Sequence, residues 1–237
     1  MSSALLEVDR LCAGYGRAQI LFDVGLQVGA GEAVALLGRN GAGKSTTLKT
    51  IMGLIEPTSG TVRFGGHDIT GWPSHRIARL GLGWVPEDRR IFTDLTVLQN
   101  LEVGRQAARG QSAPWTVQRL FELFPNLAAM PDRPGASMSG GEQQMLTVAR
   151  TLMGNPQLVL FDEPSEGVAP VIVEQMARSI NEMKRQGLSV LLSEQNLHFA
   201  ESVCDRAYVL EKGQVRFAGS MAELDADEAT RRAYLSV

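Results

Sequence analysis

The feature that most constrains this chain is a glycine-rich segment that runs into lysine and serine. It reads Gly38-Arg39-Asn40-Gly41-Ala42-Gly43-Lys44-Ser45-Thr46 and matches the phosphate-binding pattern G-x-x-x-x-G-K-[ST]. The apolar run 33–37 before it predicts a buried strand, and residues 46–52 after it predict a helix ending at Gly53. Because the motif requires a strand before it and a helix after it, these flanks favour a phosphate-binding loop over a glycine-rich turn with an incidental lysine.

The residue types of this segment suit a triphosphate. Glycines let the backbone turn so that successive N–H groups face phosphate oxygens, and the following helix adds the positive end of its dipole. Lys44 would place a compact charge on the β and γ phosphates, and Ser45 would offer its hydroxyl to Mg²⁺. The motif alone does not say what the energy of the nucleotide is used for.

Composition narrows the class of protein. The 237 residues suffice for one large α/β domain or two small lobes, and a net charge of −3 predicts no strong attraction to nucleic acid or anionic lipid. Cys12 and Cys204 lie in apolar stretches, which favours buried thiols over a disulfide or metal pair. Residues 1–7 lack the basic segment of a secretion signal, and no apolar run approaches the ~20 residues that cross a bilayer. Work at a membrane would therefore need a partner that holds the chain there.

The hydrophobic pattern predicts an α/β fold with a mostly parallel sheet. In the first part, an antiparallel β portion is expected around the phosphate-loop strand, followed by a helical lobe at 95–124 that Gly104, Gly110 and Pro114 split. The second half alternates strand and helix strictly, which is typical of a parallel sheet. The predicted strands are 5–11 (broken by the glycines at 14–16), 20–28, 33–37, 61–64, 82–85, 158–161, 188–192, 207–210 and 215–218. The predicted helices are 46–52, 74–80, 141–153, 170–186, 197–203 and a polar helix over 221–234, with a loop at 56–60 and a proline-rich linker at 125–136.

Two acids follow the strand at 158–161. Since ligands gather at the carboxyl ends of parallel strands, Asp162 and Glu163 are expected at the edge where the phosphate loop opens. Asp162 would hold Mg²⁺, through water, and Glu163 would orient and polarise an attacking water. Taken without the phosphate loop, the same acids could be solvated loop residues after a core strand.

A third element precedes the helix at 141–153. Ser139-Gly140-Gly141-Glu142-Gln143 places serine and glutamate at the spacing of a capping box, so a plain helix cap explains it. The two glycines would also leave the helix N-terminus bare and able to accept an anion from outside.

Taken in order, these three elements resemble the ATP-binding subunit of an ABC transporter, and the resemblance covers nearly the whole chain. It implies an ABC-type P-loop ATPase with 1–94 and 155–237 as an α/β core that includes an antiparallel β subdomain, and 95–154 as a helical subdomain carrying Ser-Gly-Gly. It further implies two subunits that sandwich two ATP molecules, with Ser139, Gly140, Gly141, Glu142 and Gln143 of one subunit facing the phosphate loop of the other.

Other positions follow from the same resemblance. Tyr15 matches the aromatic residue that stacks on adenine, although by itself it could be a turn tyrosine. Glu87 stands where the family usually has a glutamine that touches Mg²⁺ or the lytic water. Gln195 stands where most members have a histidine on the γ-phosphate, and the loop 165–168 replaces the usual Ser-Ala-Leu-Asp. Gln195 can donate a hydrogen bond but adds no charge to the transition state.

These departures occur together in one branch of the family. The segments 86–92, 163–170, 194–196 and 232–235 resemble the branched-chain amino acid importer ATPases of the F type, and the urea and short-amide importers are similar. The branch implies an active ATPase with Glu163 as key residue, at the cytoplasmic face of the inner membrane. Its implied partners are ATP, Mg²⁺, a second ATPase subunit (identical or related), permease subunits and, indirectly, a periplasmic solute-binding protein.

Two other classes of function are alternatives to a transporter ATPase. A soluble ABC-type ATPase acting on ribosomes or DNA would usually carry two nucleotide domains or a long coiled coil, and neither pattern occurs here. A nucleotide-gated binding module that does not hydrolyse ATP stays an alternative, because Gln195 lacks the charge of the usual histidine.

Overall fold

The computed structural model describes residues 4–109 and 113–235, so the predicted helix break at Gly110 and the residues 1–3 of the N-terminal segment lie outside the described residues. Its centre is a six-stranded sheet in the order β10-β9-β3-β8-β7-β6. All neighbouring strands from β9 to β6 run parallel, and only β10 is antiparallel to its neighbour β9. The strands are β3 (Ala33–Leu37), β6 (Leu82–Val85), β7 (Leu158–Asp162), β8 (Ser189–Glu194), β9 (Arg206–Glu211) and β10 (Gln214–Ser220).

The central strands are buried on both faces, which explains their unbroken apolar sequences. Because side chains alternate along a strand, Val159 and Phe161 of β7 point into one core while Leu158 and Leu160 point into another. In β3 the alternation is the same, with Leu37 in the first core and Leu36 in the second. The phosphate-loop strand therefore sits in the middle of the molecule, held from both sides.

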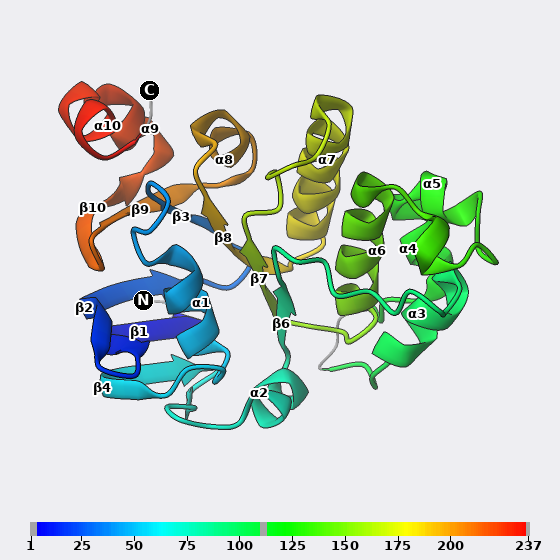
Figure 1. Cartoon of the computed structure of the whole chain (residues 1–237), viewed down its shortest axis with the longest axis horizontal. Helices are drawn as coiled ribbons and strands as arrows, with labels where there is room; N and C mark the ends of the chain where they lie inside the picture. The colour runs from blue at the N-terminus through cyan, green and yellow to red at the C-terminus, as the bar shows by residue number, and fades with distance from the viewer. Residues whose placement is uncertain (1–3, 110–112, 236–237) are drawn as a thin grey trace.

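A second, four-stranded antiparallel sheet, in the order β2-β1-β4-β5, covers one side of the molecule. Helix α1 (Lys44–Ile51) lies between the two sheets (Figure 1) and contacts β1 and β2 on one side and β7 and β8 on the other. Its buried Leu48 and Ile51 join the core that both sheets share. The strands of this sheet are β1 (Leu6–Tyr15), β2 (Ala18–Val28), β4 (Pro57–Phe64) and β5 (His67–Asp68).

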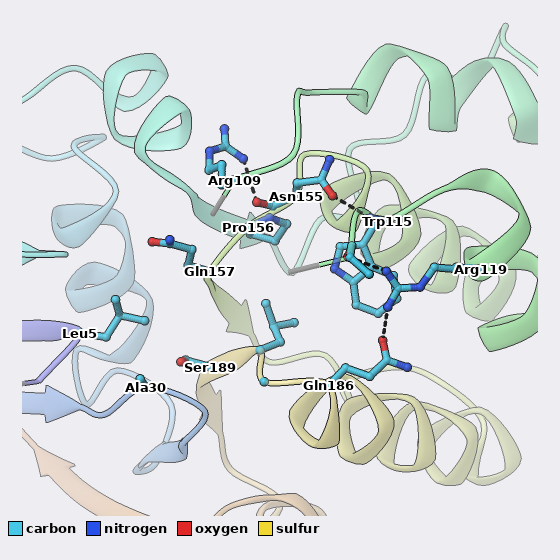
Figure 2. Close-up of a pocket in the computed structure, with 13 residues that line it drawn as sticks. Leu5, Ala30, Arg109, Trp115, Arg119, Asn155, Pro156, Gln157, Gln186 and Ser189 are labelled. Atoms are coloured by element: carbon cyan, nitrogen blue, oxygen red, sulfur yellow. Dashed lines mark hydrogen bonds between the residues drawn. The ribbon is translucent and has the colours of Figure 1, made fainter. Parts of the chain in front are cut away.

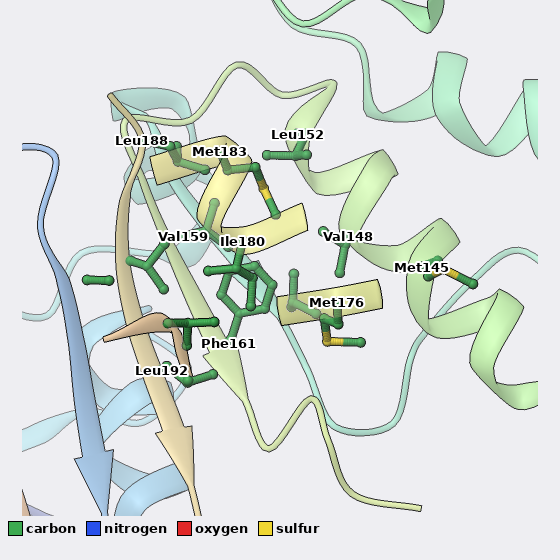
Figure 3. Packing of buried hydrophobic residues seen from close by; sticks show 14 of the residues in the cluster. Met145, Val148, Leu152, Val159, Phe161, Met176, Ile180, Met183, Leu188 and Leu192 are labelled. Carbon is green, nitrogen blue, oxygen red and sulfur yellow. The ribbon is translucent and has the colours of Figure 1, made fainter. Parts of the chain in front are cut away.

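Helices cover the opposite face of the central sheet. Helix α7 (Pro170–Arg185) packs Met176, Ile180 and Met183 against Phe161 and its neighbours, and α6 (Gly140–Leu152) packs beside it through Met145, Val148 and Leu152, as Figure 3 shows. The helices α3 to α6 gather at one end of the molecule in Figure 1. The remaining helices are α2 (Ser74–Leu80), α3 (Val97–Gly104), α4 (Val117–Leu123), α5 (Pro125–Ala128), α8 (Leu197–Val203), α9 (Met221–Ala226), α10 (Glu228–Tyr234) and the 3-10 turn η1 (Gly135–Ser137).

The predicted α/β class with a mostly parallel sheet is confirmed, and α2, β3, β6 and α8 begin and end where the sequence predicted. The predicted break at 14–16 is wrong, because β1 continues to Tyr15, which pairs with Ala18 across a tight hairpin. A side chain at Gly14 would lie 2.8 Å from the Cα of Gln19, so this glycine serves close strand approach rather than a chain break.

Three further expectations are corrected. The loop predicted at 56–60 is mostly strand, since β4 starts at Pro57; proline is tolerated there because β5 pairs only with the far end of β4. The linker at 125–136 contains α5, which Pro125 opens, and the turn η1. The single helix at 221–234 is two helices, because the Asp227 carboxylate accepts a hydrogen bond from the Thr230 N–H and caps a new helix.

Cys12 and Cys204 are both free and buried, as the sequence predicted. No helix in the described ranges combines the length and apolar character needed to cross a membrane.

Candidate functional site

The phosphate-binding loop links β3 to α1 at the carboxyl end of the central strand. Its conformation requires glycine: φ is 80° at Gly41 and 109° at Gly43, and a side chain at Gly43 would lie 2.9 Å from Leu21 Cδ2. No side chain among the described residues caps the start of α1. The first N–H groups of the helix are therefore available to an anion, as the motif requires.

Lys44 follows the glycines of this loop, and only 3% of its surface is exposed. Its Nζ donates hydrogen bonds to the carbonyl oxygens of Gly38 at 2.8 Å and Arg39 at 3.2 Å. It also forms an ion pair with Glu163 Oε1 at 3.0 Å. The charge predicted to meet phosphate is thus held in place by carbonyl groups and by the acid predicted to activate water.

Asp162 lies at the end of β7, directly beside the phosphate-binding loop. Its Oδ1 accepts hydrogen bonds from the hydroxyls of Ser45 and Ser193, both at 2.8 Å. Burial raises the pKa of Asp162, and these two hydrogen bonds partly oppose that rise. The strand register explains the geometry, because Ser193 is the residue of β8 that pairs with Asp162.

Glu163 is held by contacts on every side. Its Oε1 pairs with Lys44, and its Oε2 accepts a hydrogen bond from Gln195 Nε2 at 2.7 Å. Its φ of 46° lies in the left-handed region, which is unusual for a residue other than glycine. Burial alone would raise the pKa of this carboxyl, but hydrogen bonds with Glu166, Lys44 and Gln195 outweigh burial and hold the pKa below its usual value. Glu163 is therefore an ionised acid able to accept a hydrogen bond from water.

A cleft of about 380 Å³ opens over the loop. Its walls carry three acids, Glu87, Glu163 and Glu166, opposite Lys44. The hydrogen bond with Glu163, helped by burial and by repulsion from Glu163, Glu87 and Glu194, raises the pKa of Glu166 to about 7. The cleft is lined by Ile20, Asn40, Gly41, Gly43, Lys44, Ser45, Thr46, Glu87, Glu163 and Glu166.

A buried acid next to the cleft fixes two loops together. Glu194 is 2% exposed, and its carboxylate accepts hydrogen bonds from the backbone N–H groups of Ser165, Gln195 and Asn196 at 3.0 to 3.2 Å. Burial raises its pKa, and these hydrogen bonds oppose the rise. Glu194 thereby positions both Gln195 and the loop that follows Glu163.

Two sets of predicted site residues lie elsewhere. Tyr15 ends β1 with 52% of its surface exposed and does not line the cleft. The segment Ser139 to Gln143 forms the start of α6 and shares no lining with the phosphate-binding loop of the same chain. The fold of one chain therefore leaves these two predicted parts of an ATP site apart.

The start of α6 carries the predicted capping box. The Ser139 Oγ accepts a hydrogen bond from the Glu142 N–H at 3.4 Å, and the Glu142 carboxylate accepts one from the Ser139 N–H at 2.7 Å. The Gln143 amide donates to the carbonyl oxygens of Gly135 and Met138, which holds the preceding turn. Ser139 itself is exposed.

That the two glycines leave this helix start able to accept an anion from outside stays a prediction, and the structure shows which side chains lie beside them. Gly140 lies beneath the Arg89 guanidinium, and a side chain at Gly141 would lie 2.8 Å from Ile172 Cγ1 of α7. A side chain at Gly141 would therefore press on α7, whereas one at Gly140 would displace the end of a flexible arginine side chain.

Sequence reasoning missed four residues of this region: Ser193, Glu194, Glu166 and Arg89. Ser193 and Glu194 could have been found, because they end β8 at the same sheet edge as Asp162. Glu166 and Arg89 could not, since loop conformation alone brings them to the cleft and to α6.

The oxygen donors fit a hard cation bound together with phosphate. Asp162 and Ser45 offer a carboxylate and a hydroxyl side by side, and Glu87 lines the same cleft. Within the described residues, no group of three or more His, Cys, Asp or Glu side chains could hold a metal ion. Mg²⁺, which is bound with few protein ligands, would thus need the phosphates of the nucleotide as further ligands.

A larger cavity, of about 600 Å³, lies away from the phosphate-binding loop (Figure 2). Its polar groups serve to join elements: the Asn155 Oδ1 accepts from the Trp115 N–H at 2.7 Å, and Arg109 donates to the Asn155 carbonyl at 2.8 Å. Arg119 stacks over Trp115 and donates to Gln186 Oε1 at 2.6 Å, linking α4 to the end of α7. These hydrogen bonds connect neighbouring elements, so the side chains of Asn155, Arg109 and Arg119 in this cavity serve the fold.

The sheet, the loop and the acids at the strand ends define an α/β P-loop nucleotide hydrolase. A family model described as ABC transporter matches residues 21–166. The high-affinity branched-chain amino acid transport ATP-binding protein BraG of Pseudomonas aeruginosa is 42% identical over 231 residues, covering 98% of this chain and 99% of that protein. The lipopolysaccharide export system ATP-binding protein LptB of Acidithiobacillus ferridurans is 36% identical over 243 residues, covering 98% and 97%.

A solved structure agrees with these relatives. The ATP-binding subunit of an ABC transporter superposes with a TM-score of 0.82 at 32% identity, covering 97% of this chain and 95% of that one. The chain belongs to the ABC transporter ATP-binding family. It is an ATP-hydrolysing subunit of a transporter, and the predicted family and enzyme class are confirmed.

Proposed function

We propose that this chain powers import of branched-chain or related amino acids. The observation that carries the proposal is the 42% identity to BraG across almost the full length of both chains. The likeness to LptB favours lipopolysaccharide export as a second candidate, at lower identity. Import of urea or short amides by the same mechanism stays an alternative from the sequence pattern.

In the proposed mechanism, one ATP-binding site is built by two subunits. Lys44 and the loop N–H groups would hold the phosphates, Ser45 and Asp162 would hold Mg²⁺, and Glu87 would reach the metal or the attacking water. Glu163 accepts the proton of that water, while Gln195 orients Glu163 and the terminal phosphate. The separation of Ser139 from the cleft of its own chain supports a site completed by Ser139–Gln143 of a partner subunit. Tyr15 would reach adenine from the hairpin end of β1.

Permease subunits are the proposed membrane anchor, at the cytoplasmic face of the inner membrane, and a periplasmic solute-binding protein would deliver the cargo to them. A mostly apolar groove of about 510 Å³ lies between α2, β6 and the ends of α3 and α6, and Phe92 of the loop after β6 lines it. Phe92 and Val103 line it with 48% and 53% of their surfaces exposed. A short helix of a permease subunit is the proposed occupant, with residues 95–154 moving as a helical subdomain when ATP binds.

Steady-state ATP hydrolysis tests the site. Glu163→Gln should bind ATP, accumulate as a dimer and lose about 100-fold or more in turnover, because no carboxylate accepts the proton of water. Ser139→Arg should bind ATP as a single chain and fail to turn over, because the arginine blocks the partner's phosphate. Undiminished turnover of Glu163→Gln would remove this residue as base, and normal activity of Ser139→Arg would rule out the shared site.

Co-purification tests the proposed partner. Val103→Asp should bind ATP normally and lose its membrane subunits, since a buried carboxylate in an apolar groove is costly. Retention of these subunits by the variant would exclude the groove as the docking surface. The cargo is tested by transport of labelled leucine, compared with urea and with lipopolysaccharide release, in cells lacking the gene.

A further inference from the structure

The loop that follows β6 carries two arginines with different surroundings. Both have left-handed backbone, with φ of 62° at Arg89 and 41° at Arg90. The Thr147 hydroxyl donates a hydrogen bond to the Arg89 carbonyl, and Arg150 Nη2 donates to the Arg90 carbonyl at 2.6 Å. Two side chains of α6 therefore fix the backbone of this loop against the helix.

The guanidinium of Arg89 lies over the first turn of α6. A side chain at Gly140 would place its Cβ 3.1 Å from Arg89 Cζ and 3.4 Å from Nη2. The Nη2 also lies 4.0 Å from the Cβ position of Gly167, in the loop that follows Glu163. Arg89 thus stands between the Ser-Gly-Gly segment and that loop, in the space that Gly140 leaves free.

This is an unfavourable position for a cation without an anion beside it. The N-terminus of a helix carries partial positive charge, so a guanidinium there is repelled. None of the ion pairs among the described residues involves Arg89, whereas Arg90 pairs with Asp88 and Arg133 with Glu142. Glu142 already accepts from the Ser139 N–H, so its charge serves the cap.

We propose that Arg89 is a catalytic residue of the shared ATP site, donating hydrogen bonds to the terminal phosphate of ATP that the partner subunit's phosphate-binding loop holds. The inference rests on the proposed function, because Ser139 to Gly141 define where that phosphate lies. A planar guanidinium matches phosphate oxygens with two parallel hydrogen bonds. Its charge opposes the negative charge that builds up in the transition state, a contribution that the neutral Gln195 cannot make.

The variant Arg89→Gln keeps the length of the side chain and removes its charge. Its affinity for ATP as a dilute single chain should stay within about twofold of the wild type, because the residue acts across the interface. Turnover at saturating ATP should fall at least about tenfold, and ATP-driven dimerisation in the Glu163→Gln background should weaken. Arg89→Lys should recover part of the turnover, since it keeps the charge without the planar fork.

Arg90→Gln is the matched control on the same loop. Arg90 is exposed and paired with Asp88, and it should keep turnover near the wild-type value. The melting temperature separates function from structure: loss of a cation repelled by a helix N-terminus should leave it unchanged or raise it. A lowered melting temperature together with equal losses in both variants would overturn the proposal in favour of a structural role.

The Ser139→Arg variant distinguishes failure of the shared ATP site from failure of the proposed role of Arg89. If Ser139→Arg is inactive while Arg89→Gln turns over within twofold of the wild type, the shared site stands and the role of Arg89 is wrong. If Ser139→Arg keeps normal activity, the shared site fails, and the role of Arg89 fails with it.

Discussion

Glu163 shows how closely the fold controls one side chain. The ion pair with Lys44 joins two nearly buried charges, with 3% and 7% of their surfaces exposed. Removing either partner leaves an uncompensated buried charge, which is strongly destabilising. If Lys44 binds phosphate as proposed, a bound triphosphate would compete with Glu163 for this ammonium and would free the carboxylate toward water.

Glu166 predicts a measurable dependence of stability on pH. Its pKa is raised to about 7 from the ordinary value of 4.5, chiefly by the hydrogen bond with Glu163. Between these two values the folded protein binds more protons at Glu166 than the unfolded chain does. Its contribution therefore favours the folded state at low pH and is lost as the pH rises through about 7.

Thermal unfolding of the wild type and Glu166→Gln, measured from pH 5 to pH 8, tests this. The melting temperature of the variant relative to the wild type should rise with pH, because the amide cannot ionise beside Glu163. A difference that is constant over this range would show that Glu166 keeps an ordinary pKa.

At the scale of elements, two similar helix caps allow the effect of a cap on stability to be distinguished from an effect on activity. The helices α6 and α9 begin with the same capping box, Ser139 with Glu142 and Ser220 with Glu223. One lies where a partner's phosphate is proposed and the other at the C-terminal end of the chain. The two boxes therefore form a natural pair for comparison.

Ser139→Ala and Ser220→Ala should each lose about 1 kcal/mol of stability, because each removes one capping hydrogen bond. Only Ser139→Ala should lose turnover at saturating ATP, by about tenfold or more. Chemical denaturation and the ATPase rate measure the two effects. Equal turnover in both variants would reduce Ser139 to a plain helix cap.

At the scale of the whole molecule, the site depends on the two sheets that pack on either side of helix α1. Helix α1 is buried between them, so the phosphate-binding loop is fixed by both cores at once. A ligand that binds this loop stabilises the folded state of the whole chain by mass action.

At ATP and Mg²⁺ concentrations near 100 times Kd, binding should contribute about 2.7 kcal/mol. For a chain of this size the melting temperature should then rise by roughly 5–10 °C. Lys44→Ala should abolish the rise, and AMP should give a smaller one because it lacks the phosphates that Lys44 meets. A full shift in Lys44→Ala would contradict the role of this lysine.

Much of the fold could be predicted from the sequence, because its signals are local. The strand at 33–37 and the helix at 197–203 match their predicted bounds, since a continuous apolar run marks the strand and apolar residues at helical spacing mark the helix. The errors fell at Tyr15, Pro57 and Asp227, where pairing partners or a side-chain cap decide the structure. For the site, the phosphate-binding loop and Glu163 line one cleft, and Asp162 lies beside the loop through its hydrogen bond with Ser45, while their predicted roles and that of Tyr15 stay predictions.

The sequence by itself determined the phosphate-binding loop, the acids that follow the neighbouring strand, and the family. Each of these is recognised from a short run of consecutive residues, because the local backbone conformation or chemistry requires particular residue types there. Only the tertiary structure decided that Lys44 and Glu163 form an ion pair, that Ser193 and Ser45 share Asp162, and that the Arg89 guanidinium lies over Gly140. These contacts join residues about 30 to 120 positions apart, and no local pattern encodes them. They arise from strand register and loop conformation, which the packed sheet imposes on the chain as a whole.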